Sequence, residues 1–287
     1  MLAACNGCGI GRHVDGVDRD VVRPAQLPLA RGVHDHRPDS QEYEDGGKQP
    51  SCPFQQGACH PYLGGAVYSS SPAIGTVAGP NLTRGKGGIG ADYSDMDFVR
   101  AIRRGVRRDG RSLVVMPSEV FTHLSQEDLG AVIAFLKQVP PVDREVPRSG
   151  FGPVGRALLA AGKMNILVAG KTPHITPPAS VPADTTAVYG KYLADIAGCH
   201  GCHGYGLSGG RVAGPPGLPP ASNLTPAGIG SWTEADLARA LREGKRPDGS
   251  QLDEFMPWKV FRGMTDAEIH AIWLYLRSVP ARPFGNK

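Results

Sequence analysis

Residues 199–203 read Cys-His-Gly-Cys-His, two cysteines separated by two residues and followed at once by a histidine. This C-x-x-C-H spacing is typical of covalent c-type haem attachment. Two thiols on one turn can add to the two vinyl groups of a haem, and the imidazole of the next residue then lies under the iron. The motif therefore predicts that Cys199 and Cys202 bind haem covalently and that His203 is an axial ligand of the iron.

Two other interpretations of this motif fit the rest of the sequence less well. A zinc site would need a second Cys or His pair at ligand spacing, and the remaining cysteines and histidines do not offer one cleanly. A thioredoxin-like dithiol would need a βαβ context, whereas the flanks of residues 199–203 have a helical pattern and are rich in glycine and proline. Cys5-Asn-Gly-Cys8 is followed by glycine, so it lacks the ligating histidine and is left unassigned.

A second axial ligand is expected downstream, because a thioether is a common sixth ligand that raises the potential of a haem electron carrier. Met256 lies in the stretch Phe-Met-Pro-Trp at 255–258, where the proline stiffens a loop. Met264 is a rival nearby, but it stands at the expected start of a helix. We predict Met256 as the ligand, with packing in the core as the alternative role of such a methionine.

The chain also carries an internal repeat, with residues 81–140 and 223–280 as two copies of one pattern. A period this long indicates tandem domains, since the repeats of solenoid proteins run about 20–50 residues. The recurrence of Met-Pro in register supports a role for both methionines. The matching stretches are Asn81-Leu-Thr with Asn223-Leu-Thr, Gly88-Ile-Gly with Gly228-Ile-Gly, Asp109-Gly with Asp248-Gly, and Met116-Pro with Met256-Pro.

Capping signals and hydrophobic periodicity predict short helices in both copies. Thr265-x-x-Glu268 resembles a capping box, and apolar residues recur after it at helical spacing, as they do after Ser125. Shorter helices are predicted at about 97–104 and 236–243, and another at 185–197, ahead of the haem motif. Each domain then has a core too small to be stable unless something as large as a haem fills its centre.

The overall composition agrees with small, loop-rich domains. Glycine (39) and proline (26) are frequent among the 287 residues, and six cysteines are too few for a disulfide scaffold. No apolar stretch approaches the ~18–20 residues that span a bilayer. The net charge of +4 is too small to imply nucleic-acid binding by itself.

The sequence resembles the class I cytochrome c family. The resemblance rests on residues 199–203, the preceding helix with Gly190, Asn223-Leu-Thr, the Met256-Pro loop and the C-terminal helix. It implies an all-α fold of two tandem cytochrome c-like domains, the first one degenerate. More narrowly, the tandem arrangement is similar to bacterial multi-domain c-type cytochromes, including cytochrome subunits of membrane-associated alcohol and sugar dehydrogenases. The predicted division is an atypical segment (1–55), a degenerate cytochrome c-like domain (56–142), a linker (143–184) and a cytochrome c domain (185–284).

The first copy lacks an intact attachment motif. Cys59-His60 aligns with Cys202-His203, and Leu63-Gly-Gly then aligns with Ser208-Gly-Gly, but Gln56 occupies the place of the first cysteine. This degenerate motif leaves the number of haems open between one and two.

Three interpretations of the first copy stay open. Haem is held there through one thioether at Cys59, with His60 and Met116 as axial ligands; or the site is empty and the domain only packs; or the upstream sequence is not what the gene encodes. Residues 1–55 are polar and show no helical period, so we interpret them as a disordered or mistranslated segment. Sequencing the locus tests the third interpretation.

The resemblance implies an electron carrier, not an enzyme, that holds haem c and passes electrons between a dehydrogenase and an oxidase or another cytochrome of a respiratory chain. The alternatives are a haem enzyme of the di-haem peroxidase kind, which would need an open sixth position at iron, and a non-haem scaffold with empty sites. Covalent haem attachment takes place outside the bacterial cytoplasm. The resemblance therefore implies a periplasmic or outward-facing protein at the inner membrane, although Met1 is not followed by a complete secretion signal.

One dense basic run, residues 100–111, is interpreted as a solvated face. The alternative is electrostatic docking of an acidic redox partner or of an anionic membrane surface. No recognised nucleic-acid-binding module accompanies the run, so we expect no nucleic-acid partner.

Overall fold

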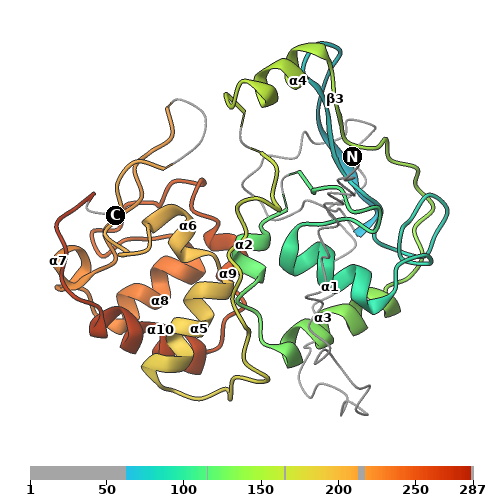
Figure 1. The fold of residues 1–287 in the computed structure, drawn as a ribbon. Helices are drawn as coiled ribbons and strands as arrows, with labels where there is room; N and C mark the ends of the chain where they lie inside the picture. Colours follow the sequence, from blue (N-terminus) through green and yellow to red (C-terminus); the bar gives the residue numbers. More distant parts are fainter. Residues whose placement is uncertain (1–62, 115, 165, 213–216, 286–287) are drawn as a thin grey trace, which may run out of the picture. The chain divides into compact units, whose positions relative to one another are not determined.

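The computed structural model describes residues 63–285, except 115, 165 and 213–216. Short helices predominate, and the chain also forms one small sheet (Figure 1). In chain order the elements are β1 (Ala66–Ser71), β2 (Gly75–Gly79), α1 (Asp95–Arg104), α2 (Ser118–Phe121), α3 (Gln126–Gln138), β3 (Gly150–Phe151), α4 (Pro153–Ala160), α5 (Ala187–Ile196), α6 (Cys199–His203), α7 (Pro226–Ile229), α8 (Glu234–Glu243), α9 (Trp258–Phe261) and α10 (Asp266–Ser278).

The second copy of the repeat is built around the crossing of α5 and α10. A Cβ atom on Gly190 would lie 1.8 Å from the carbonyl oxygen of Ala271, so only glycine allows the two helices to approach this closely. Figure 1 shows α5, α8 and α10 packed together. Their buried apolar side chains form one core, which consists of Leu193, Leu207, Ile229, Leu237, Ile269, Ala271, Ile272 and Leu276.

The first copy has a smaller core of the same kind. It lies mainly between α1 and α3 and contains Phe98, Ile102, Leu124, Leu129 and Ile133. Ile196 of α5 packs against this cluster as well as against the second one, so α5 contacts both copies.

The repeat predicted from the sequence is preserved in the local backbone. Leu63 and Leu207 both have positive φ, at 59° and 57°, which is uncommon for leucine. The carbonyl oxygen of Leu63 accepts a hydrogen bond from the Leu82 amide (2.7 Å), as that of Leu207 does from the Leu224 amide (2.8 Å). The structure therefore matches Leu63 with Leu207, and the alignment of Leu63 with Ser208 is wrong by one residue.

The predicted helix ends are also found. Capping boxes are present at Ser94–Asp97, Thr233–Asp236 and Thr265–Glu268. Helices α1 and α8 each begin two residues before their predicted starts, because the helix begins directly after the capping residue.

A three-stranded sheet departs from the all-α expectation, which is not confirmed. β1 and β2 form an antiparallel hairpin, and β3 adds to β2 through the pairs Gly75 with Phe151 and Thr76 with Gly150. Gly75 has φ 127°, and a Cβ atom there would lie 2.2 Å from the carbonyl oxygen of Gly150. The approach of β3 thus depends on glycine as the first residue of β2, and the strands of the hairpin contain valine, tyrosine and threonine, which favour strands.

Residues 143–184, predicted as a linker, carry more structure than a linker needs. They contain β3 and α4, and Val168 is buried with 7% of its surface exposed. Leu167 bridges to Val114, so this stretch returns to the first copy before the chain reaches α5. Among the described residues, no helix is both long and apolar enough to cross a membrane.

Candidate haem site

The C-x-x-C-H motif forms its own short helix, α6, directly after α5. Gly198 and Gly204 flank it with positive φ values of 75° and 78°, so the chain turns sharply at both ends of the motif. Cys199 and Cys202 are both partly buried, and they form no disulfide in the described part of the chain. The two predicted attachment residues and His203 therefore lie within one helix of five residues.

The imidazole of His203 is buried and oriented by the backbone. Its Nδ1 atom lies 2.7 Å from the carbonyl oxygen of Ser222, and only 8% of the residue is exposed. A carbonyl oxygen can only accept, so Nδ1 carries the proton and donates it. Nε2 is then the nitrogen whose lone pair can bind a metal, the usual arrangement of a ligating histidine.

Burial keeps the Cys199 thiol neutral, raising the pKa of that thiol to about 12. A redox dithiol and a zinc ligand both react as thiolates, so this environment does not favour either alternative. In the part of the chain that the structure describes, no group of three or more His, Cys, Asp or Glu side chains is arranged to hold a metal ion.

The loop between α8 and α9 presents Met256 in a tight turn. The Met256 amide donates to the carbonyl oxygen of Asp253 (3.0 Å), and the Trp258 amide donates to that of Met256 (2.7 Å). The rival Met264 packs against the core of the second copy. Met256 is half-buried in this turn. Met264 is thus a core methionine and Met256 a loop methionine, and Met256 as the iron ligand stays a prediction.

Trp258 carries a buried polar atom that lacks a partner. Among the described residues, none accepts a hydrogen bond from its indole Nε1 atom, and the atom is buried. The ring packs closely on Gly244, where a Cβ atom would lie 2.5 Å from Cε2. In the first copy the same place holds Ser118, whose hydroxyl donates to the carbonyl oxygen of Ala101 (3.2 Å). The unsatisfied donor is therefore a feature of the copy with the intact motif.

This donor is the observation on which a haem can be tested. A buried N–H normally finds an acceptor, and haem carries two carboxylates that could provide one. Lys259 and Arg262 each place their cationic group 5.5 Å from the centroid of the Trp258 ring, which favours an anionic group nearby. The residues around the Met256 loop therefore fit a haem. Trp258 was not predicted as a site residue from the sequence. The difference between the two copies could have indicated it, since tryptophan follows Met256-Pro257 and serine follows Met116-Pro117.

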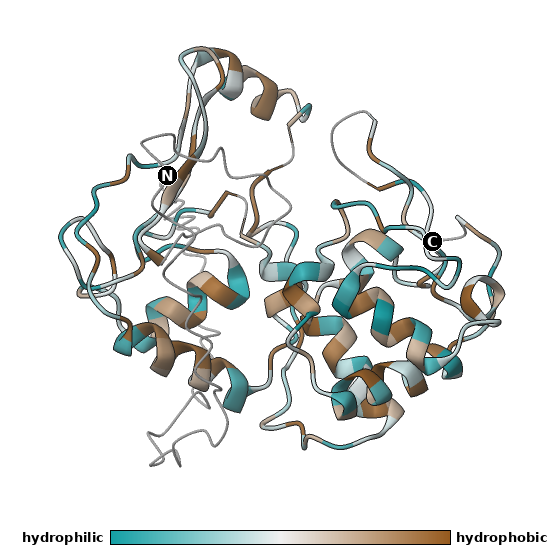
Figure 2. Cartoon of the chain, turned by 180° about the vertical axis from the view of Figure 1, so that it is seen from behind, coloured by the Kyte–Doolittle hydropathy of each residue, from teal (hydrophilic) through white to brown (hydrophobic). Residues whose placement is uncertain are grey.

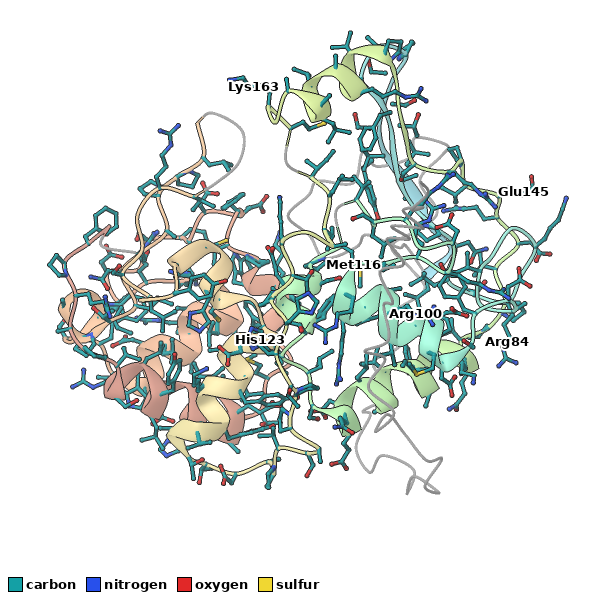
Figure 3. The ribbon with its side chains drawn as sticks, viewed as in Figure 1. Arg84, Arg100, Met116, His123, Glu145 and Lys163 are labelled. Carbon is teal, nitrogen blue, oxygen red and sulfur yellow. The ribbon has the colours of Figure 1, made fainter. Side chains whose placement is uncertain are left out.

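A second group that the sequence did not predict holds α6 against α5. His200 Nε2 lies 3.0 Å from a carboxylate oxygen of Asp195. Burial opposes ionisation of Asp195, but hydrogen bonds from His200 and Lys191 outweigh it and lower the pKa of the carboxyl. Burial also lowers the pKa of His123, which is labelled in Figure 3 and lies near Asp195. This hydrogen bond holds the attachment helix at its second residue.

The counterpart site in the first copy is described only in part. Cys59 and His60 lie outside the described residues, as do Gln56 and residues 1–55. Met116, labelled in Figure 3, is half-buried and packs against the core of the first copy. A second haem with Met116 as ligand stays a prediction.

Most of the basic run is used within the fold. Arg103 is buried and donates to the carbonyl oxygens of Leu124 (2.8 Å) and Ser125 (2.9 Å). Arg100 lies 3.2 Å from the Asp97 carboxylate, and Arg107 lies at the same distance from that of Asp109. Acidic neighbours and carbonyl groups thus engage the charges, an arrangement that favours a structural role over partner docking.

Known proteins resemble this chain over most of its length. The fructose dehydrogenase cytochrome subunit of Gluconobacter japonicus is 31% identical over 254 residues, which cover 78% of this chain and 50% of that protein. The cytochrome c subunit of the quinone alcohol dehydrogenase of Gluconobacter oxydans (strain 621H) is 31% identical over 276 residues, covering 80% and 53%. A diheme cytochrome c-type protein of Cereibacter sphaeroides is 28% identical over 225 residues, covering 72% and 73%.

The chain spans about half the length of the dehydrogenase subunits that it matches. The family model described as Cytochrome c matches residues 187–280, from the start of α5 to just beyond the end of α10. The same similarity supports haem c as the cofactor. Residues 187–280, with the C-x-x-C-H motif on α6, therefore belong to the cytochrome c family.

Proposed function

We propose that this chain is an electron-transfer protein that carries haem c and acts as a cytochrome subunit of a dehydrogenase complex. The observation that carries the proposal is α6, where two cysteines at C-x-x-C spacing and a buried histidine with an oriented imidazole lie on one short helix. The relatives are named as cytochrome subunits of fructose and alcohol dehydrogenases, which supports a dehydrogenase as electron donor. A respiratory oxidase or another cytochrome would accept the electrons.

Each residue of the site has a distinct role in this proposal. Cys199 and Cys202 hold the haem through thioether bonds, and Nε2 of His203 and the sulfur of Met256 bind its iron. The Ser222 carbonyl keeps the His203 ring in orientation and strengthens its basicity. Haem supplies the reversible one-electron chemistry when bound, and the chain supplies burial, orientation and potential.

The first copy is proposed to be a degenerate cytochrome c-like domain in tandem with the second, over about residues 56–142 and 185–284. The shared caps and the paired positive φ values of Leu63 and Leu207 support a common origin of the two copies. The position of Met116 against the first core favours a packing role for this domain over a second haem site.

The proposed location is the periplasmic side of the inner membrane. Covalent haem attachment takes place outside the cytoplasm, and the relatives named above serve dehydrogenases that we take to be membrane-associated. Dependence on the periplasmic maturation system tests this location. Cytoplasmic expression of the same chain should leave it without covalent haem.

Haem per polypeptide, measured as the pyridine haemochrome after periplasmic maturation, tests the proposal. One haem with the band of two thioethers is expected. The Met256→Ala variant should lose the thioether-to-iron charge-transfer band, whereas Met264→Leu, the matched control in the core, should retain it. A colourless protein would overturn the proposal and favour a scaffold. A resting iron with an open sixth position would favour a haem enzyme. A second haem with a single-thioether band would assign Cys59 as its attachment residue and His60 and Met116 as the ligands of its iron.

A further inference from the structure

His200, inside the attachment motif, has an oxygen acceptor at each of its two ring nitrogens. Its Nε2 atom lies 3.0 Å from Oδ1 of Asp195, and its Nδ1 atom lies 3.3 Å from the carbonyl oxygen of Gly204. A carbonyl oxygen only accepts hydrogen bonds, and so does an ionised carboxylate. A neutral imidazole has one N–H, so one of its nitrogens would point a lone pair at an oxygen. The doubly protonated ring satisfies both contacts.

The surroundings of the ring also suit a positive charge. The His200 ring stacks on the ring of Tyr205, with centroids 6.1 Å apart and planes inclined by 19°. The face of an aromatic ring attracts a cation. The side chains of His200 and Asp195 are 15% and 12% exposed, so water screens their contact only weakly. The carboxylate of Asp195 therefore favours the cationic form of His200.

The other titratable groups around this contact act on it less directly. Nζ of Lys191 lies 2.6 Å from Oδ2 of Asp195, but the lysine side chain is 57% exposed, so solvent weakens its repulsion of a cation at His200. His123, in the turn before α3, interacts electrostatically with Asp195 and His200, and burial lowers the pKa of His123, which favours its neutral form. Tyr275 on α10 interacts with Asp195, and burial raises the pKa of this phenol, so it is neutral as well. The Asp195 carboxylate is thus the charge in direct contact with the His200 ring.

His200 shares a short helix with the predicted iron ligand His203. The two residues are three positions apart on α6, and side chains at this spacing lie on one face of a helix, with Cβ atoms about 5–6 Å apart. His203 is buried, and its Nδ1 donates to the Ser222 carbonyl oxygen, which leaves Nε2 for the iron. A positive charge at His200 therefore lies close to the ligand of the iron, where it favours the reduced state.

We propose that His200 is a proton-binding site that couples proton uptake to reduction of the haem. This inference rests on the proposed function, because it needs a haem held by His203. In the step, the dehydrogenase donates one electron to the haem iron, and the neutral imidazole of His200 takes one proton from the solvent. Reoxidation returns the electron to the acceptor and the proton to the solvent. The net charge of the site is then the same in both redox states.

This coupling predicts a definite pH dependence of the haem potential. His200 binds its second proton more tightly when the iron is reduced, so the potential falls with rising pH where His200 loses that proton. The potential is constant at lower pH, where His200 is cationic in both redox states, and at higher pH, where it is neutral in both. We expect proton affinities that differ about tenfold between the two states, which corresponds to a fall of about 59 mV for a one-electron couple.

Spectroelectrochemical titration of the full, haem-matured chain between about pH 5 and pH 9 measures this fall. The variant His200→Gln, which cannot take up a proton, should abolish it. Asp195→Asn, which removes the carboxylate, should move the fall to lower pH. The matched control is His270→Gln, because His270 Nδ1 lies 3.0 Å from Glu234 Oε2 in another histidine–carboxylate pair of the same domain. This control should leave the fall unchanged.

A second measurement observes the proton itself and needs no variant. Nitrogen NMR of the reduced chain with labelled histidine should find both nitrogens of the His200 ring protonated below the pH of the fall and one above it. The His200 signals are identified by the contact of this ring with Tyr205. A ring with one proton throughout this pH range would overturn the proposal.

Three results of the titration would also overturn it. They are a potential that does not change with pH, a fall that persists in His200→Gln, and a fall that His123→Gln abolishes while His200→Gln does not. A chain that matures without haem would overturn the proposed function and this inference together. A haem-loaded chain with a constant potential would overturn this inference alone.

Discussion

The crossing of α5 and α10 makes the sharpest prediction about stability. A Cβ atom on Gly190 would lie 1.8 Å from the carbonyl oxygen of Ala271, whereas real Cβ contacts essentially never fall below 3.0 Å. In the Gly190→Ala variant, helices α5 and α10 must therefore move apart by roughly 1 Å. The obstacle is backbone, so it cannot give way by rotating a side chain.

The size of the effect follows from two opposing terms. Alanine gains about 1 kcal/mol over glycine within a helix. Overpacking of a core costs about 1–3 kcal/mol, occasionally more, and here separating the helices also loosens Leu193 and Ile272. Because the obstacle is backbone and cannot move aside, we take the upper end of this cost, about 3 kcal/mol, and expect a net loss of about 2 kcal/mol in the free energy of unfolding, or about 8–16 °C in the melting temperature of a domain of this size.

Denaturant unfolding of the haem-matured chain, followed by far-ultraviolet circular dichroism, measures this loss. Gly263→Ala is the matched control, because a Cβ atom there meets nothing within 4 Å and the backbone is not left-handed. This control should lie within about 0.5 kcal/mol of the wild type. A Gly190→Ala variant as stable as Gly263→Ala would refute the reasoning and the close crossing itself.

Three further predictions concern single side chains. Arg103→Met, which removes the donors to two buried carbonyl oxygens, should cost about 2–4 kcal/mol in urea unfolding, whereas Arg111→Met, at an exposed side chain, should cost less than about 0.5 kcal/mol. The hydrogen bond with Ser94 lowers the pKa of Asp97 below 3.8 in the folded protein. The ionised carboxylate therefore stabilises the fold above pH 3.8, and this stabilisation is lost as the pH falls through the pKa of Asp97 in the folded protein. Ser94→Ala should therefore cost about 1 kcal/mol at pH 7 and less at pH 3, and an equal cost at both would contradict this. In haem-free protein, burial raises the pKa of the Cys199 thiol from 9.0 to about 12. Alkylation at pH 8, followed by mass mapping, should therefore be about 1,000-fold slower at Cys199 than at an unperturbed thiol, and its rate should rise as the pH approaches 12.

Features that depend on neighbouring residues could be predicted from the sequence. The capping box predicted at Thr265 is confirmed, since a cap joins a side chain to an amide three residues away. Helices α1 and α8 end at residues 104 and 243 as predicted, each followed by a left-handed glycine, Gly105 or Gly244.

Features that depend on residues far apart along the chain could not be predicted from the sequence. β3 pairs with β2 across about 75 residues of sequence, and the sheet was not expected. The orientation of His203 depends on a carbonyl oxygen at Ser222, which no motif indicates. Arg103 belongs to a run that looks exposed, yet it is buried because the turn before α3 presents two carbonyl oxygens to it.

The sequence alone determined the attachment motif and the positions where helices begin and end, because each of these depends on residues that are neighbours along the chain. It also determined the repeat, because two stretches of the sequence can be compared directly. Only the tertiary structure decided which sides of those helices are covered. Counted from the capping residues Ser125 and Thr265, Ala131 of α3 corresponds to Ala271 of α10, yet Ala271 is completely buried and Ala131 is exposed. The difference comes from α5, which lies some 80 residues from α10 along the chain, crosses α10 at Ala271 and contacts α3 at its N-terminal end. Burial is a property of what packs against a residue, and a segment's own sequence does not contain it.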